Sequence, residues 1–120
     1  MKLKNQYIRY MLVGIYRDEN FTYARAAIIP SLRVSFIVES KAEEIKCVEK
    51  LDQKYVLKND LIGIIGIDRI CAIDMIVTEK GYQKIKLILN VVKDEILRKI
   101  ACDAVFGLDA ITVLDLPLFL

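Results

Sequence analysis

Residues 36–43 (Phe-Ile-Val-Glu-Ser-Lys-Ala-Glu) decide the predicted fold, because they join the end of an apolar strand to the start of a helix. Ser40 can cap that helix, and Glu43 follows three residues later as in a capping box. Apolar residues then recur every three positions up to Leu51 and leave the charged residues on the other side. The pattern predicts a helix over residues 40–51.

The same order of residue types returns at residues 75–82 (Met-Ile-Val-Thr-Glu-Lys-Gly-Tyr). Each copy is a strand, a cap and an amphipathic helix, and a further apolar strand follows each one. Two such halves in tandem give an α+β fold, the ferredoxin-like βαββαβ two-layer sandwich. We therefore predict one domain, with an N-terminal extension over residues 1–30, a first βαβ half over 31–68 and a second over 69–120.

Apolar patterns predict the remaining elements. The β-branched run at residues 61–67 is too continuous for a half-exposed strand, so we expect a central strand there. The length of the apolar pattern at residues 81–100 favours a helix, and a strand up to Val91 followed by a short helix is the alternative. Residues 110–116 are β-like, and Pro30 indicates a hairpin or a corner between two strands.

Composition excludes several classes of function. The chain has 120 residues, of which 55% are hydrophobic and 28% charged, with a net charge of +2 and no His. Without His there is no Ser-His or Cys-His nucleophile pair, no His-ligated zinc and no common neutral-pH proton shuttle. Nucleic acid is not expected as a partner, because phosphate binding needs clustered basic residues. We expect no catalytic residues, no bound metal and no cofactor.

The cysteines and the apolar segments predict a cytoplasmic protein. Cys47, Cys71 and Cys102 are odd in number, far apart and set in apolar surroundings, which is typical of reduced, buried thiols. No apolar stretch approaches the roughly 20 residues that a membrane span needs. The apolar run near the N-terminus is too short for a signal peptide with its cleavage site.

The excess of apolar residues predicts self-association. Two helices on one side of a sheet would leave apolar strand residues facing water on the other side, and a large apolar patch marks an interface. The apolar tail at residues 116–120 supports the same prediction. We expect a homo-oligomer.

A small-ligand site is predicted around two glycines. Gly63 and Gly66 would let the backbone approach an anion, while Arg69 supplies paired donors. We predict a ligand-binding site of Gly63, Gly66, Asp68, Arg69 and Lys80 for a small anionic effector. In the alternative interpretation, the glycines relieve crowding in a sheet and the Asp-Arg pair is a turn.

The second half of the chain resembles a known family. From residues 73–77 (Ile-Asp-Met-Ile-Val) to residues 104–111 (Ala-Val-Phe-Gly-Leu-Asp-Ala-Ile), it looks like the second βαβ half of the PII-like signalling proteins. The resemblance implies a ferredoxin-like fold, assembly as a trimer, and clefts between subunits that bind adenine nucleotides or other small effectors. The glycine-rich nucleotide-contacting stretch of that family is absent from this chain.

A second resemblance involves an acidic pair. Residues 12–20 (Leu-Val-Gly-Ile-Tyr-Arg-Asp-Glu-Asn) are similar to the signature of the LAGLIDADG homing endonucleases, which implies Glu19 as a metal-binding acid. Independently of that resemblance, the paired carboxylates of Asp18 and Glu19 are suited to binding a divalent cation, or to a solvated turn.

The leading hypothesis is a self-associating regulatory or small-ligand-binding module that performs no chemical step. It would capture its effector in a cleft between subunits and shift the population of oligomers or loops. The alternatives are a degenerate LAGLIDADG-like metal-dependent nuclease or nucleic-acid-binding protein, and a purely structural assembly protein.

Overall fold

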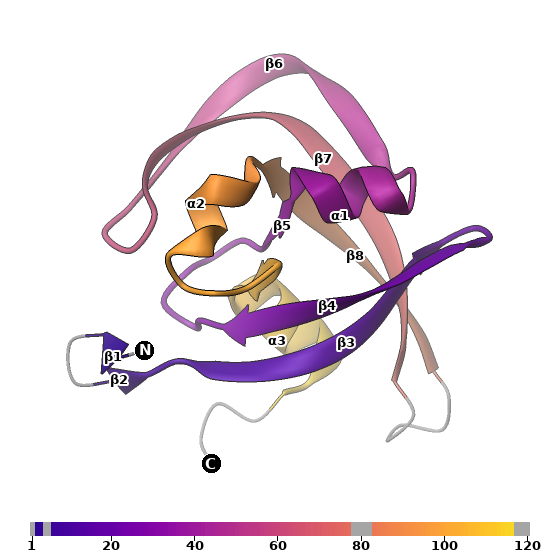
Figure 1. Ribbon diagram of the computed structural model, residues 1–120, viewed down its shortest axis with the longest axis horizontal. Helices are drawn as coiled ribbons and strands as arrows, with labels where there is room; N and C mark the ends of the chain where they lie inside the picture. Colours follow the sequence, from indigo (N-terminus) through magenta and orange to yellow (C-terminus); the bar gives the residue numbers. More distant parts are fainter. Residues whose placement is uncertain (1, 4–5, 78–82, 117–120) are drawn as a thin grey trace.

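The computed structural model describes residues 2–3, 6–77 and 83–116. Within this part, the chain is mostly β, with a seven-stranded mixed sheet, a separate two-stranded sheet and three short helices (Figure 1). The strands are β1 (Lys2–Leu3), β2 (Gln6–Tyr7), β3 (Arg9–Arg17), β4 (Asn20–Ile28), β5 (Phe36–Val38), β6 (Val48–Asn59), β7 (Gly63–Val77), β8 (Gln83–Val92) and β9 (Ala104–Phe106). The helices are α1 (Glu39–Glu44), α2 (Asp94–Arg98) and α3 (Leu108–Leu114).

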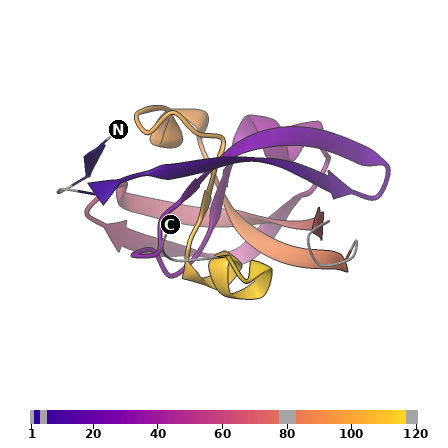
Figure 2. The same ribbon diagram turned by 90° about the horizontal axis from the view of Figure 1, so that it is seen from below.

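The large sheet closes on itself to form a barrel. Its strand order is β3-β4-β9-β5-β8-β7-β6, and β3 also pairs with β7 where Tyr16 lies opposite Asp74. The strands from β3 to β7 therefore make a ring, and β6 extends it as the outer strand of a long hairpin (Figures 1 and 2). The turn of the β3–β4 hairpin projects past the other strands in both views.

The larger hydrophobic core fills the interior of this barrel. Alternate residues of each strand point inward, and α1 and α3 add buried residues to the same cluster. A smaller core lies on the outer side of the sheet, where α2 and the outer half of the β6–β7 hairpin cover β4, β5 and β9. The inner core includes Ile15, Ala42, Ile73, Leu89 and Ile111, and the outer core includes Phe36, Ile67, Leu97, Ile100 and Val105.

The barrel shows that the ferredoxin-like βαββαβ prediction is wrong, beginning with its first helix. The helix expected over residues 40–51 is the shorter α1, which ends where Lys46 adopts a left-handed backbone with φ of 55°. From Val48 the chain is drawn into β6 by hydrogen bonding to β7. The Ser40 side chain caps nothing, since Val38 is the N-cap residue, and the Ser40 backbone N–H donates to Asp94 Oδ1 at 3.0 Å.

The prediction of a helix over residues 81–100 is also wrong. The alternative, a strand followed by a short helix, is confirmed by β8 and α2. Ile85, Leu87 and Leu89 are buried, whereas Lys84 and Lys86 are exposed. This period of two reflects pairing of β8 with both β7 and β5. In the second copy of the internal repeat, the strand β8 therefore stands where a helix was expected. Residues 78–82 of this copy lie outside the described residues.

Other expectations had mixed outcomes. The strand at residues 61–67 is confirmed from Gly63 onward, and β7 continues through Asp68 and Arg69 without a break. The expectation that it is not half exposed is wrong, because Ile65 and Ile67 are buried whereas Ile64 is 72% exposed. The strand expected over residues 110–116 is wrong, because α3 occupies most of it and buries Ala110, Ile111 and Leu114 in the barrel. Pro30 lies at a corner rather than in a hairpin, since β4 and β5 each pair with β9.

Two of the three cysteines are joined, which contradicts the prediction of three reduced thiols. Cys47 and Cys71 form a disulfide with their Cα atoms 5.0 Å apart, and Cys102 is a free, buried thiol. The disulfide ties the segment between α1 and β6 to the middle of β7. In the described part of the chain, no helix is long and apolar enough to cross a membrane.

Two segments cross very closely where β9 leads into α3. The N–H groups of Leu108 and Asp109 donate to the carbonyls of Leu32 and Arg33 at 2.7 and 3.2 Å. Gly107 directly precedes Leu108, and a Cβ on Gly107 would lie only 2.7 Å from Leu32 O and closer still to Val34 O. Both neighbours are backbone atoms of the crossing segment, so only glycine fits at this position.

We predict that Gly107→Ala lowers the free energy of unfolding by about 2 kcal/mol or more, because the added methyl group must push two backbone segments apart. The φ of −86° at this position suits alanine, so the cost is steric. Urea denaturation would measure it. Gly14→Ala is the control, because its Cβ would meet side-chain rings rather than backbone, with the tip of the exposed Phe21 ring nearest at 3.0 Å. Equal costs in the two variants would contradict the prediction.

Removing the disulfide should lower the free energy of unfolding by about 3 kcal/mol, the chain-entropy value for a loop of this length, since the bonded cysteines are 24 residues apart. The test compares wild type with Cys47→Ala/Cys71→Ala in denaturant, with and without dithiothreitol. The reductant should destabilise wild type only. An equal effect on both proteins, or none on either, would contradict the assigned bond.

Candidate functional site

The residues of the predicted ligand site do not converge on one pocket. Gly63 begins β7 with a φ of 80°, and Gly66 lies beneath the Lys54 side chain. Arg69 follows on the same strand, about 20 Å from Gly63 at the usual rise per residue. Lys80 lies outside the described residues.

The Arg69 guanidinium is already engaged by carboxylates. Its Nη1 lies 2.5 Å from Glu39 Oε2, and its Nε lies 3.5 Å from Asp68 Oδ1. The ion pair with Glu39 joins β7 to the start of α1. An incoming anion would have to displace both partners, so the structure gives the predicted site no support.

The acidic pair proposed for metal binding forms a turn. Asp18 and Glu19 are exposed and link β3 to β4, and Asp18 adopts a left-handed φ of 54°. Arg17 Nε lies 3.9 Å from Asp18 Oδ2. Among the described residues, no group of three or more His, Cys, Asp or Glu side chains is placed to hold a metal ion.

The outer face of the β3–β4 hairpin carries a row of exposed apolar side chains. Leu12 is 73% exposed, Phe21 53% and Tyr23 59%. The register pairs Leu12 with Arg25, Gly14 with Tyr23, and Tyr16 with Phe21, so all these residues share one side of the hairpin. We call this surface the hairpin face and define it by Leu12, Tyr16, Phe21, Tyr23 and Arg25.

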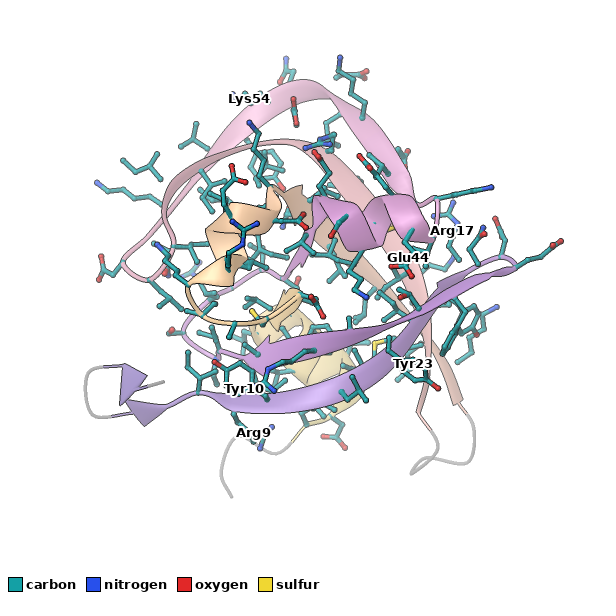
Figure 3. All side chains as sticks on the ribbon, viewed as in Figure 1. Arg9, Tyr10, Arg17, Tyr23, Glu44 and Lys54 are labelled. Carbon is teal, nitrogen blue, oxygen red and sulfur yellow. A yellow bond between two sulfur atoms is a disulfide. The ribbon has the colours of Figure 1, made fainter. Side chains whose placement is uncertain are left out.

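Aromatic contacts order the hairpin face. The rings of Phe21 and Tyr23 meet edge to face with centroids 4.9 Å apart, and the tip of the Phe21 ring lies over Gly14. At the other end, the Arg25 guanidinium stacks 4.0 Å from the centroid of the Tyr10 ring. Figure 3 labels Arg17 and Tyr23 toward the turn and Tyr10 toward the opposite end of the hairpin.

The hairpin face has opposite charges at its two ends. Arg25 lies at the end near Tyr10, and the acidic turn of Asp18 and Glu19 lies at the other. The ring-bearing rows lie between these charges. A surface of this kind is apolar at its centre and polar at its rim, as protein interfaces are.

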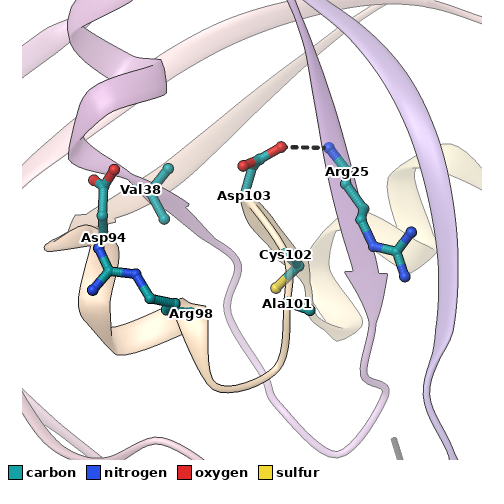
Figure 4. Close-up of a pocket in the computed structure, with 7 residues that line it drawn as sticks. All are labelled: Arg25, Val38, Asp94, Arg98, Ala101, Cys102 and Asp103. Carbon is teal, nitrogen blue, oxygen red and sulfur yellow. Dashed lines mark hydrogen bonds between the residues drawn. The ribbon is translucent and has the colours of Figure 1, made fainter.

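A separate pocket of about 260 Å³ opens where α2 and the segment after it approach β4 and β5 (Figure 4). Asp103 anchors one wall, because its Oδ2 accepts the Arg25 backbone N–H at 2.9 Å and its own N–H donates to Arg25 O at 2.8 Å. Asp94 anchors the opposite wall through its bond from the Ser40 N–H. The lining residues are Arg25, Val38, Asp94, Arg98, Ala101, Cys102 and Asp103.

Two groups in this pocket have shifted pKa values. Burial alone would raise the pKa of Asp94, but hydrogen bonds from Ser40 and the charge of Arg98 outweigh it and lower that pKa below its ordinary value. Burial, with a smaller contribution from the Asp103 charge, raises the pKa of the Cys102 thiol to about 11. At neutral pH, Asp94 is therefore a carboxylate, and Cys102 is a protonated, weakly nucleophilic thiol.

Sequence reasoning missed both surfaces. The residues that line the pocket come from β4, β5 and the region after β8, so no local sequence motif predicts it. The hairpin face had a readable signal, because Phe21 and Tyr23 alternate with the buried Thr22 and Ala24. Aromatic residues on the side that faces away from the core indicate a strand with a second apolar side, which its own core does not cover.

No protein-family model matches the chain, and no curated protein matches it either. The relationship to the PII-like proteins and the relationship to the LAGLIDADG endonucleases therefore remain predictions. The ferredoxin-like fold implied by the first resemblance is corrected by the barrel described above.

The lowered pKa of Asp94 predicts a pH-dependent contribution to stability. Because the folded pKa lies below the unfolded value, the contribution is present above the ordinary pKa of 3.8 and is lost as the pH falls through the folded value. Wild type should therefore be more stable than Asp94→Asn at pH 6, and the gap should close as the pH is lowered through the folded pKa of Asp94. Asn keeps an acceptor for the Ser40 N–H but removes the charge.

Urea denaturation of both proteins across this pH range measures the gap. Arg98→Gln should reduce the pH dependence of wild type, because the Arg98 charge contributes to the shift. A gap between wild type and Asp94→Asn that stays constant with pH would refute the electrostatic role of Asp94.

Proposed function

We propose that this protein is a self-associating module that forms a homodimer through the hairpin face. The observation that carries the proposal is the grouping of three large apolar side chains, each more than half exposed, on one side of one hairpin. Isolated exposed apolar residues are normal on a protein surface, whereas a contiguous patch marks an interaction site. The expectation of self-association from composition agrees with this proposal.

The charges at the two ends of the hairpin face favour a second copy of the chain as the partner. A two-fold axis near the Ile15–Thr22 row would bring Arg25 of one copy opposite Glu19 of the other. The same axis would lay the ring of Tyr23 against the partner's Phe21 and Tyr16. Such an interface is self-complementary, with an aromatic centre and an ion pair at each end.

The hairpin face is a better candidate than the exposed apolar residues of the β6–β7 hairpin. Val56 and Ile64 also lie in the open, on the outer side of the β6–β7 hairpin, but Lys54 and Lys58 accompany them on that side. Lysine along an outer strand discourages association. The β6 strand also bulges between Lys50 and Tyr55, which interrupts the regular edge that another strand would need.

We propose that the module works in the cytoplasm, as its sequence predicts. In a reducing compartment, Cys47 and Cys71 would be held as thiols. Cys47 Sγ lies 3.5 Å from the Ala42 carbonyl, so the reduced thiol has a buried acceptor in place.

Tyr23→Lys should weaken the dimer at least tenfold, because Tyr23 lies one row from the proposed axis and the substitution places a cation at the aromatic centre of the contact. Sedimentation equilibrium of the whole chain over a range of concentrations gives the dissociation constant. Ile64→Lys is the matched control, since Ile64 is an aliphatic strand residue that is 72% exposed outside the hairpin face. A wild-type monomer at all concentrations, or a dimer that only Ile64→Lys weakens, would overturn the proposal.

A charge swap tests the two-fold arrangement itself. Arg25→Glu and Glu19→Arg should each weaken association, and the double variant should restore it because the opposite charges meet again across the axis. Wild-type association should also fall as salt is added. A double variant that is weaker than both single variants would contradict this arrangement and leave the hairpin face to associate in another register.

A further inference from the structure

The pocket between α2 and β4 is bounded by charged side chains of both signs. Asp94 and Asp103 lie on either side of Val38, and Arg98 extends beside Asp94 (Figure 4). Arg25 completes the set from β4. Two carboxylates and two guanidinium groups give the lining a formal net charge of zero.

The acidic groups and the basic groups of the pocket differ in the hydrogen bonds and ion pairs that they form within the protein. One oxygen of each carboxylate accepts a backbone N–H, from Ser40 in one case and from Arg25 in the other. Within the described residues, neither the Arg25 nor the Arg98 guanidinium forms an ion pair within 4.0 Å. The carboxylates are thus fixed in position. The Arg25 guanidinium stacks on the Tyr10 ring, so Arg98 is the guanidinium that remains available to an anionic group of a ligand.

This charge pattern selects against simple ions. A small anion would meet two fixed carboxylates, and a small cation would meet two guanidinium groups, so each would be repelled by half of the lining. A ligand with a positive and a negative group a few bonds apart would satisfy both sets. An ammonium group can donate to Asp94 and Asp103 while a carboxylate faces Arg98. The Arg98 guanidinium is well suited to paired hydrogen bonds with a carboxylate.

The size and the remaining lining limit the ligand further. A volume of about 260 Å³ is below the roughly 300–1,000 Å³ of pockets that hold drug-sized molecules. Val38, Ala101 and the Cys102 thiol supply a small apolar surface between the charged walls. A short aliphatic side chain would fit there, and a nucleotide would not.

We propose that this pocket binds a small zwitterionic α-amino acid, with its ammonium group toward Asp94 and Asp103 and its carboxylate toward Arg98. The proposal goes beyond self-association, because α2 and the segment after it lie off the hairpin face. It also differs from the anionic effector predicted from the sequence, since the pocket offers as many acidic as basic groups.

Calorimetric titration of the whole chain with L-alanine tests the proposal, with acetate and methylammonium as the two half-ligands. L-Alanine should bind, and each half-ligand should bind at least tenfold more weakly. Binding of acetate or of methylammonium as tightly as L-alanine would identify a simple ion site and overturn the proposal. No heat from L-alanine up to about 10 mM would also overturn it.

Two conservative variants locate the binding. Arg98→Gln removes the proposed carboxylate partner, and Asp103→Asn removes one negative charge but keeps an acceptor for the Arg25 N–H. Each should raise the dissociation constant of L-alanine at least tenfold while thermal unfolding shows that the fold is retained. Arg33→Gln, an exposed cation outside the pocket, is the matched control and should bind normally. Unchanged binding in both pocket variants would overturn the proposal.

Cys102 provides a readout that does not depend on heat. It lines the pocket and is the free thiol of the described structure, so a bound amino acid should slow its alkylation by N-ethylmaleimide. L-Alanine should protect it, and N-acetyl-L-alanine, which lacks the ammonium group, should not. Equal protection by both compounds, or by neither, would contradict the assigned orientation or the site itself.

Discussion

The crossing of the segment at residues 29–35 with the segment at residues 106–109 is the contact on which the barrel depends. At its centre, the Gly107 N–H donates to Ser35 Oγ at 2.9 Å, and the Ser35 hydroxyl donates to Asp109 Oδ1 at 2.6 Å. The Ser35 carbonyl accepts two N–H groups of Asn90, whose side-chain oxygen accepts the Tyr55 hydroxyl. The hydroxyl and the carbonyl of a fully buried serine are thus both hydrogen-bonded, and one network joins the segment before β5 to β6, β8 and α3.

This crossing places β9 between β4 and β5, and so determines where apolar surface is left over. Once the ring is closed, its interior is filled by inward residues together with α1 and α3. The surplus apolar residues must lie outside the ring. Part of the outer side is covered by α2 and the β6–β7 hairpin. This cover reaches Tyr10 and Ala27 but not the part of the β3–β4 hairpin nearer its turn, where Leu12, Phe21 and Tyr23 stay exposed.

Local patterns predicted single elements better than they predicted the fold. The apolar run that begins β7 was recognisable as a strand from its β-branched residues, but its continuity wrongly indicated burial on both faces, since Ile64 is exposed. The β8 pattern fitted both periods, and only pairing with β7 and β5 selected the strand, which is information from distant residues. In α3, β-branched residues such as Ile111 and Val113 favoured a strand, but their place after Gly107 at the barrel mouth imposed a helix. The pocket had no local pattern, since residues up to 78 positions apart meet there.

Arg25 belongs to both proposed surfaces, and this shared residue sets the relation between them. Its backbone N–H holds Asp103 in the pocket, while its guanidinium stacks on Tyr10 at the end of the hairpin face. A partner subunit that engages this guanidinium removes one positive charge from the neighbourhood of the pocket. A ligand whose ammonium group lies against Asp103 in turn changes the charge close to Arg25, which holds Asp103 in place. Because linkage is reciprocal, the factor by which dimerisation changes ligand affinity must equal the factor by which the ligand changes dimerisation.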